Sequence, residues 1–279
     1  MGAPSTSPLS LNTATTRKQW GLAQAIEGCM RHGILGIAPW RDQLHEMGVQ
    51  AAAKAIRNHE LTVTGLCRGG MFPASDAAGR KAAIEDNLRA VDEAQALGAQ
   101  CLVLVAGGLP AGSKDLAAAR EQVRDGIAAI LPRAREARVP IAIEPLHPMY
   151  AADRACVNTL AQALDLCDTL DPENEGGLGV ALDVYHVWWD PQLEYGIARA
   201  GKRRLLAFHV CDWLVPTPHM LLGRGMMGDG VIDIRSIRAA VEQAGYTGPI
   251  EVEIFNQAIW DMPGDEVLDL MCARFVEYV

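Results

Sequence analysis

The stretch PIAIEP, residues 140–145, is an apolar run that ends near a single carboxylate, and three later stretches share this design. They are GVALDVYH (179–186), LAFHVCD (206–212) and PIEVEIFN (249–256). The polar residues are Glu144, Asp183, His209 and Glu253, and the steps between them are 39, 26 and 44 residues, about 36 on average. A spacing this regular indicates a repeated strand–helix unit in which each polar side chain lies at a similar height.

Similar apolar runs occur in the rest of the chain, with longer Ala-, Leu-, Glu- and Arg-rich runs between them. We expect eight strands, at residues 9–13, 34–38, 61–66, 101–106, 140–145, 178–184, 205–212 and 250–255. Helices are expected between them, for example over 80–97 and 116–137. Eight units in 279 residues leave about 35 residues each, which suits a (β/α)8 TIM barrel. The sequence therefore predicts one barrel domain over residues 1–279, with 1–8 as a flexible tail.

Charge and composition exclude several classes of protein. The chain has 25 Lys and Arg against 34 Asp and Glu, a net charge of −9. Nucleic-acid binding needs a basic surface, and no basic run occurs, so we expect no nucleic-acid partner. No apolar run has the length of a membrane span, and the seven cysteines form no C-x-x-C pair. We therefore expect a cytoplasmic protein that does not bind membranes.

The polar strand ends predict a metal site. The working face of a TIM barrel lies at the carboxyl ends of its strands, so Glu144, Asp183, His209 and Glu253 should converge there. The residues two positions earlier on three of these strands are small: Ala142, Ala181 and Ala207. Because side chains alternate along a strand, these alanines should lie beneath the site and leave room above. Three carboxylates and one imidazole favour one divalent ion, Mn²⁺, Mg²⁺ or Co²⁺, with Zn²⁺ as a further candidate.

Other side chains near the strand ends are candidates for the same site. Glu251 has the inward parity of Glu253, so it would pair with an interior cation or exchange roles with Glu253. Arg68, in the CRGG segment, would hold a substrate hydroxyl or carboxylate, or else form an ion pair. His147 in EPLHP is a candidate for the substrate pocket. Trp188, one of five tryptophans in segments that follow expected strands, would stack on a sugar, pack a loop or form a subunit interface.

The chain resembles the xylose isomerase-like barrel family of sugar isomerases and epimerases in five segments between about residues 140 and 255. They are IAIEPLHP, ALDVYHVWWD, AFHVCDW, GRGMMGDGVIDI and GYTGPIEVEIF. The resemblance implies a catalytic metal held by Glu144, Asp183, His209 and Glu253. It implies that the two glutamates are also the catalytic acid and base, and that His186 and Arg224 bind substrate. Residues 1–139 resemble the family only in their alternation of strands and helices.

We therefore expect a metal-dependent isomerase or epimerase of a sugar or an inositol-derived ketone, which works through a metal-stabilised enediolate. The alternative is a hydro-lyase of the inosose dehydratase type, because loss of a β-hydroxyl begins from the same enediolate. A DNA hydrolase of the endonuclease-IV type needs a histidine-rich zinc site and a basic groove, and a non-catalytic sugar-binding barrel is a further alternative. The Trp-rich loops and Met226-Met227 suggest a homo-oligomer.

Overall fold

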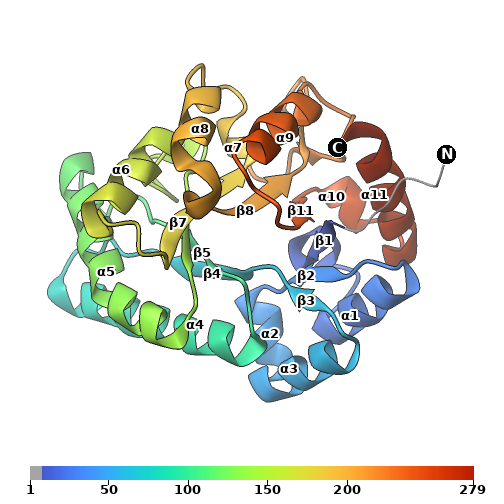
Figure 1. Ribbon diagram of the computed structural model, residues 1–279, viewed down its shortest axis with the longest axis horizontal. Helices are drawn as coiled ribbons and strands as arrows, with labels where there is room; N and C mark the ends of the chain where they lie inside the picture. Colours follow the sequence, from blue (N-terminus) through green and yellow to red (C-terminus); the bar gives the residue numbers. More distant parts are fainter. Residues whose placement is uncertain (1–7) are drawn as a thin grey trace.

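Strands surround the centre of the molecule and helices cover the outside (Figure 1). The computed structural model describes residues 8–279, so the expected tail at 1–8 lies almost entirely outside the described residues. The barrel strands are β1 (Leu9–Asn12), β2 (Gly36–Ala38), β3 (Thr62–Val63), β4 (Leu66–Gly70), β5 (Leu102–Val105), β6 (Ile141–Glu144), β7 (Leu178–Asp183), β8 (Leu205–Val210) and β11 (Ile250–Val252). All eight expected strand positions are occupied, which confirms the TIM barrel.

The third of the eight strand positions is split between β3 and β4. The sheet runs β3-β2-β1-β11-β8-β7-β6-β5-β4 and its neighbours are parallel. The Thr64 N–H donates to the Ile37 carbonyl at 3.0 Å, whereas the Leu66 N–H donates to the Cys101 carbonyl at 3.0 Å. Within three residues, the chain thus stops pairing with β2 and begins to pair with β5. The expected strand end at Leu66 was therefore wrong, because β4 continues along β5 as far as Gly70.

Eight helices pack around the strands. They are α1 (Leu22–Arg31), α3 (Val49–Asn58), α4 (Ala77–Leu97), α5 (Leu116–Ala137), α6 (Leu160–Leu170), α8 (Leu193–Arg204), α9 (Ile234–Gln243) and α11 (Gly264–Tyr278). Several begin at a side-chain cap: the carboxylates of Asp76, Asp115 and Asp233 accept main-chain N–H bonds at the starts of α4, α5 and α9. The helices expected at 80–97 and 116–137 are confirmed as α4 and α5.

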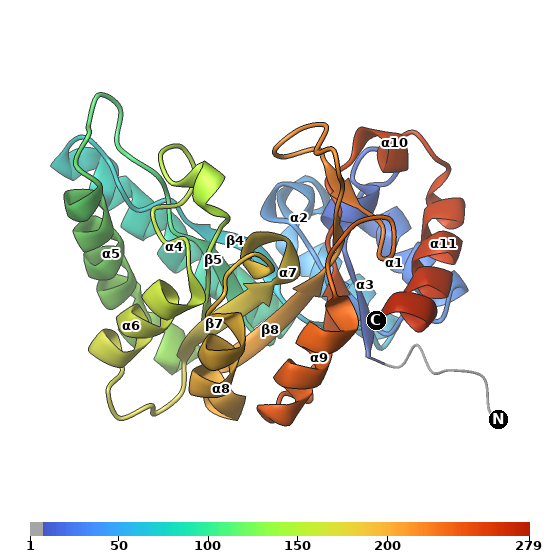
Figure 2. The same cartoon turned by 90° about the horizontal axis from the view of Figure 1, so that it is seen from above.

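Short helices occupy the loops that follow several strands. They are η1 (Thr13–Thr16), α2 (Arg41–Met47), η2 (Pro148–Tyr150), α7 (Val184–Val187) and α10 (Gln257–Trp260). A two-stranded antiparallel ribbon, β9 (Asp212–Trp213) with β10 (Arg224–Gly225), follows β8. Figure 2 shows α4, α5 and α6 on one side of the strands and α1, α10 and α11 on the other. These loop elements carry side chains to the carboxyl-terminal mouth of the barrel.

A layer of small buried residues fills the interior of the barrel below this mouth. The layer, which we call the floor, consists of Cys67, Cys101, Val103, Ala142, Ala181 and Ala207. The three alanines are those expected beneath the site, and Ala181 pairs with Ala207 across β7 and β8. Small side chains here leave the space above them open to functional groups.

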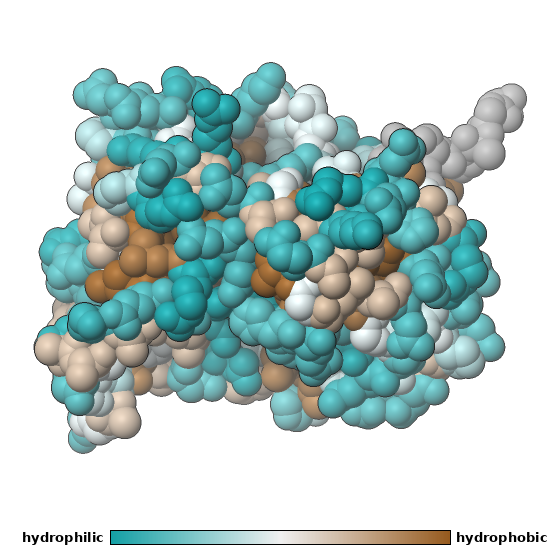
Figure 3. Space-filling model, turned by 90° about the horizontal axis from the view of Figure 1, so that it is seen from below, coloured by the Kyte–Doolittle hydropathy of each residue, from teal (hydrophilic) through white to brown (hydrophobic). Residues whose placement is uncertain are grey.

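The outer surface is mainly polar. Figure 3 shows hydrophilic residues over most of one face, with apolar residues gathered in recesses between them. In the part of the chain that the structure describes, no helix is both long and apolar enough to cross a membrane.

Candidate functional site

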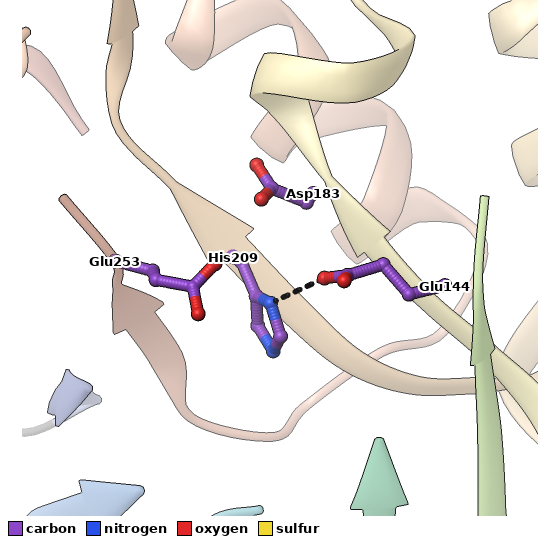
Figure 4. Close-up of side chains that lie close together, drawn as sticks. All are labelled: Glu144, Asp183, His209 and Glu253. Atoms are coloured by element: carbon purple, nitrogen blue, oxygen red, sulfur yellow. Dashed lines mark ion pairs between the residues drawn. The ribbon is translucent and has the colours of Figure 1, made fainter. Parts of the chain in front are cut away.

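Four polar side chains converge at the carboxyl ends of neighbouring strands (Figure 4). Glu144 and Asp183 end β6 and β7, His209 lies in β8, and Glu253 directly follows β11. Asp183 and His209 are direct partners in the sheet register. One ligand atom from each of the four residues lies within 4.8 Å of all the others, and all four residues are buried. The structure thus brings together the four side chains that the sequence singled out.

The imidazole of His209 shows that this cluster suits a cation. Its Nδ1 lies 3.2 Å from Oε1 of Glu144. Among the described residues, neither ring nitrogen makes a hydrogen bond of acceptable geometry, although both are buried. A buried polar atom without a well-formed hydrogen bond is costly, so a cation that displaces the ring proton and binds the nitrogen lone pair would stabilise this arrangement. Three carboxylates and one imidazole form a donor set that fits a divalent metal ion.

Arg224 places a positive charge beside this set of ligands. Its Nη1 lies 2.7 Å from Oδ2 of Asp183 and 3.0 Å from Oε2 of Glu253. With this guanidinium, a divalent cation would balance the three ligand carboxylates in charge. Burial alone would raise the pKa of Asp183, but Arg224 and the nearby histidines outweigh it and lower that pKa. Asp183 is therefore ionised and ready to act as a ligand.

Two other groups of the site have strongly shifted pKa values. Burial raises the pKa of Glu253 to about 8, against the opposing charge of Arg224. Burial disfavours the charged form of His209, but Glu251 and Glu144 outweigh it and raise the pKa to about 10. Both groups therefore hold protons at neutral pH until a cation displaces them.

Glu251 lies directly below His209. The two residues are partners in the register of β11 and β8, and Oε1 of Glu251 is 3.5 Å from Nε2 of His209. The Glu251 carboxylate accepts hydrogen bonds from Asn12 Nδ2 at 2.6 Å and Thr64 Oγ1 at 2.9 Å. No interior Lys or Arg pairs with it among the described residues. From this position the Glu251 carboxylate can orient the imidazole ring.

A cavity of about 230 Å³ opens above the cluster. Glu144 and Glu253 line its deep end, together with His186 and Arg224. The lining also includes apolar and aromatic side chains: Trp40, Val103, Val105, Leu146, Leu221 and Phe255. The cavity is smaller than the ~300–1,000 Å³ that is usual for small-molecule sites, so it suits a ligand of a few carbons rather than a polymer.

The expected substrate-binding residues separate into two groups. His186, Arg224 and Arg68 line the cavity. His186 is buried, and burial lowers its pKa to about 3, so its imidazole is neutral at neutral pH. Its Nε2 lies 3.1 Å from Nη2 of Arg224, and its Nδ1 accepts the His147 N–H at 3.2 Å. The main chain of His147 therefore positions His186.

The side chains of His147 and Trp188 do not line the cavity. The His147 ring stacks on Trp213 with centroids 4.9 Å apart, and Trp188 packs against the same Trp213 at 5.7 Å. Trp188 faces a separate surface hollow beside α8 and α9. Of the five tryptophans in segments after strands, Trp40 is the one that lines the cavity.

Asp212 holds a loop of the site in place, and the sequence analysis did not single it out. It is buried, and its carboxylate accepts the main-chain N–H groups of Gly228, Gly230 and Ile232 at 2.9 to 3.0 Å. These bonds fix the loop that follows Arg224. The carboxylate in AFHVCDW, eleven residues before the segment GRGMMGDG, was the only available signal in the sequence. Met226 and Met227 in this loop are fully buried, so they provide no exposed surface for the expected oligomer.

The segment 214–223, which contributes Leu221 to the cavity, is also held in place by hydrogen bonds. The hydroxyl groups of Tyr150 and Tyr185 both donate to the Met220 carbonyl, at 2.5 and 3.0 Å. This contact holds residues 214–223 against the short helices η2 and α7 that follow β6 and β7.

The fold and the sequence place the chain in a known family. It belongs to the xylose isomerase-like TIM barrel family, which it matches over residues 21–272. An inosose isomerase from Bacillus velezensis is 21% identical over 271 residues, which cover 93% of this chain and 92% of that protein. A protein from Sinorhizobium meliloti 1021 of known crystal structure is 60% identical, with a TM-score of 0.95 over 98% of this chain and 99% of that one. The crystal structure of IolI with a bound zinc atom has a TM-score of 0.83 at 20% identity and covers 98% of each chain.

Proposed function

We propose that this protein is a divalent-metal-dependent isomerase or epimerase of a sugar or an inositol-derived ketone. The observation that carries the proposal is the convergence of three carboxylates and one imidazole, of which Glu144 and Glu253 line a small cavity. The inosose isomerase among the relatives and the zinc in the IolI structure support it.

The residues of the site have complementary roles in this reaction. Bound at the four ligands, a divalent cation supplies Lewis-acid stabilisation for negative charge that develops on a carbonyl oxygen. Glu144 and Glu253 flank His209 and both reach the cavity (Figure 4). One glutamate removes the proton from the carbon beside the carbonyl, and the other returns a proton to the opposite face or to the neighbouring carbon. In this proposal His186 and Arg224, which line the cavity, bind the substrate hydroxyl groups.

Proton exchange with solvent tests this proposal. The metal-loaded protein is incubated in D₂O with a panel of ketoses and inososes, and the products are followed by NMR. We expect deuterium at an inverted or shifted carbon, and no exchange after the metal is removed with a chelator until it is added back. Loss of water from the substrate would instead identify the hydro-lyase. Neither exchange nor elimination across the panel would contradict both.

A further inference from the structure

Four arginines line the cavity: Arg17, Arg68, Arg154 and Arg224. Two of them have a clear carboxylate partner, since Arg17 pairs with Asp42 and Arg224 with Asp183 and Glu253. Those two guanidinium groups are therefore largely neutralised by the protein itself.

Arg68 differs from them. It is partly buried, and within the described residues 8–279 it has no ion pair and no hydrogen bond. Two acidic groups of α4, Asp86 and Glu93, are bound to Arg41 at 2.8 and 2.6 Å and pair with it rather than with Arg68. Burial and the neighbouring charge of Arg154 lower the pKa of Arg68, which shows that this part of the cavity disfavours a further positive charge. An arginine left in such surroundings lacks the anion that would stabilise it.

Arg154 adds a second positive charge at the same opening. Its nearest carboxylate, the exposed Asp153, is 3.8 Å away, too far for a hydrogen bond. Its guanidinium lies over the ring of Tyr150, 5.7 Å from the ring centre. When a divalent cation and Arg224 balance the three ligand carboxylates, Arg68 and Arg154 remain as the excess positive charge of the cavity.

The main chain holds Arg68 in place. The side-chain amide of Asn87 holds the main chain of Gly70 with two hydrogen bonds. Its Oδ1 accepts the Gly70 N–H at 2.6 Å, and its Nδ2 donates to the Gly70 carbonyl at 2.8 Å. Gly70 has a φ of +101°, and a Cβ atom there would lie 1.9 Å from the Val105 carbonyl oxygen. The two glycines of CRGG therefore let the strand end press against β5, which fixes the main chain that carries Arg68. Only the side chain then has to be ordered when an anion binds.

We propose that Arg68, assisted by Arg154, binds an anionic group on the substrate, so that the substrate is an acidic hydroxy-ketone rather than a neutral sugar. This inference rests on the proposed function for the position of the reacting carbonyl, beside Glu144 and Glu253 in the same cavity. The guanidinium fork binds a carboxylate or a phosphate group through two parallel hydrogen bonds, and the two anions share this chemistry.

Matched neutral and charged probes test the inference on the full-length, metal-loaded protein. D-Fructose is the neutral probe, 5-keto-D-gluconate carries a carboxylate, and D-fructose 6-phosphate carries a phosphate. Binding is measured by calorimetry and proton exchange by NMR in D₂O. We expect at least one charged probe to bind tenfold or more tightly than D-fructose, and the charged probe that does so identifies the anion.

Three variants locate the effect. Arg68→Gln should remove the advantage of the charged probe, so that its affinity falls by at least tenfold more than the affinity for D-fructose. Arg68→Lys should keep part of that advantage, because it retains the charge and loses the fork. Arg57→Gln, on the exposed face of α3, is the matched control and should leave all three affinities unchanged. Melting temperatures confirm that each variant is folded.

The outcomes separate this inference from the proposed function. Equal affinity for charged and neutral probes, or equal losses for both in Arg68→Gln, would overturn the anion site and leave the metal-dependent chemistry standing. Binding of a charged probe that depends on Arg68, without proton exchange on any probe, would support the anion site and count against the proposed reaction.

Discussion

Strands β6, β7, β8 and β11 carry or directly precede the four ligand side chains, whereas β1 to β5 carry none of them. The first group, which we call the ligand half, places ionisable groups at the end of each strand. The other, the supporting half, contributes Asn12 and Thr64 to the carboxylate behind His209, and Arg68 to the cavity. From this difference we expect the reaction to depend on the ligand half. We expect the supporting half to adjust the affinity for the metal and to select the substrate.

The largest expected effect is in the ligand half. Glu253→Gln and Glu144→Gln should each lower the rate of exchange by about a thousandfold or more, because general acid–base catalysis contributes about 10²–10⁴ and each residue is also a metal ligand. Glu242→Gln, on α9 and away from the cavity, is the control. The exchange rate by NMR measures the loss. A rate within tenfold of the original enzyme would remove that glutamate from the reaction.

His209→Ala should lower metal content, because it removes the one nitrogen ligand of the cluster. The bound metal per protein, measured by elemental analysis after dialysis, should fall well below that of the original protein. His45→Ala, an exposed histidine in α2, should retain full occupancy. Unchanged metal in His209→Ala would place the binding site elsewhere.

Glu251→Gln tests whether the supporting half acts on the metal. A residue that orients a metal-binding histidine typically contributes about 10- to 100-fold in metal affinity, and we expect a loss in this range. Thr64→Val removes one hydrogen bond to Glu251 and should give a smaller loss in the same direction. Competition with a chelating dye measures both affinities. If neither variant differs from the original protein, the two halves are independent.

Metal affinity should rise with pH. Glu253, with its pKa of about 8, and His209, with its pKa of about 10, both hold protons at neutral pH in the absence of metal. A cation must displace these protons, so acid weakens binding and alkali strengthens it, by up to about tenfold per pH unit for each proton released. Dissociation constants at pH 6, 7 and 8 measure the slope. A constant affinity over this range would contradict the protonation states assigned here.

The smallest effect is expected at Trp188. Because it packs on Trp213 outside the cavity, Trp188→Phe should change KM for any substrate less than threefold. Trp40→Phe, which alters the cavity wall, is the contrasting variant and should raise KM more. A larger effect at Trp188 than at Trp40 would show that the substrate reaches beyond the cavity.

The sequence revealed the ligand half more fully than the supporting half. The polar residues at the ends of apolar strands are visible in a single sequence, and the strand period alone places Glu144, Asp183, His209 and Glu253 at one height. The neighbours of Glu251 could not be found this way, because Asn12 and Thr64 are 239 and 187 residues away and meet it only when the barrel closes. The split between β3 and β4 likewise depends on which neighbour each piece pairs with.

Aromatic residues show a second limit of what can be predicted from the sequence. Trp40 and Trp188 both follow expected strands, so the sequence treats them alike. Their difference comes from the directions of the loops: the Trp40 Nε1–H donates to Asn12 at 2.8 Å and turns the ring toward the cavity, while Trp188 packs beside α8. Arg68 was ambiguous for the same reason, since only the folded chain shows that the acidic groups of α4 are bound to Arg41.

The floor of the barrel has a consequence for the order of events at the site. Ala142 and Ala181 are fully buried and Ala207 is 6% exposed, so the floor closes the bottom of the barrel to anything the size of a substrate. The mouth is then the shared path, and a substrate bound there would stand between the cation and the solvent. We therefore expect the ion to bind before the substrate, and a saturating substrate to slow the escape of the ion to a chelator.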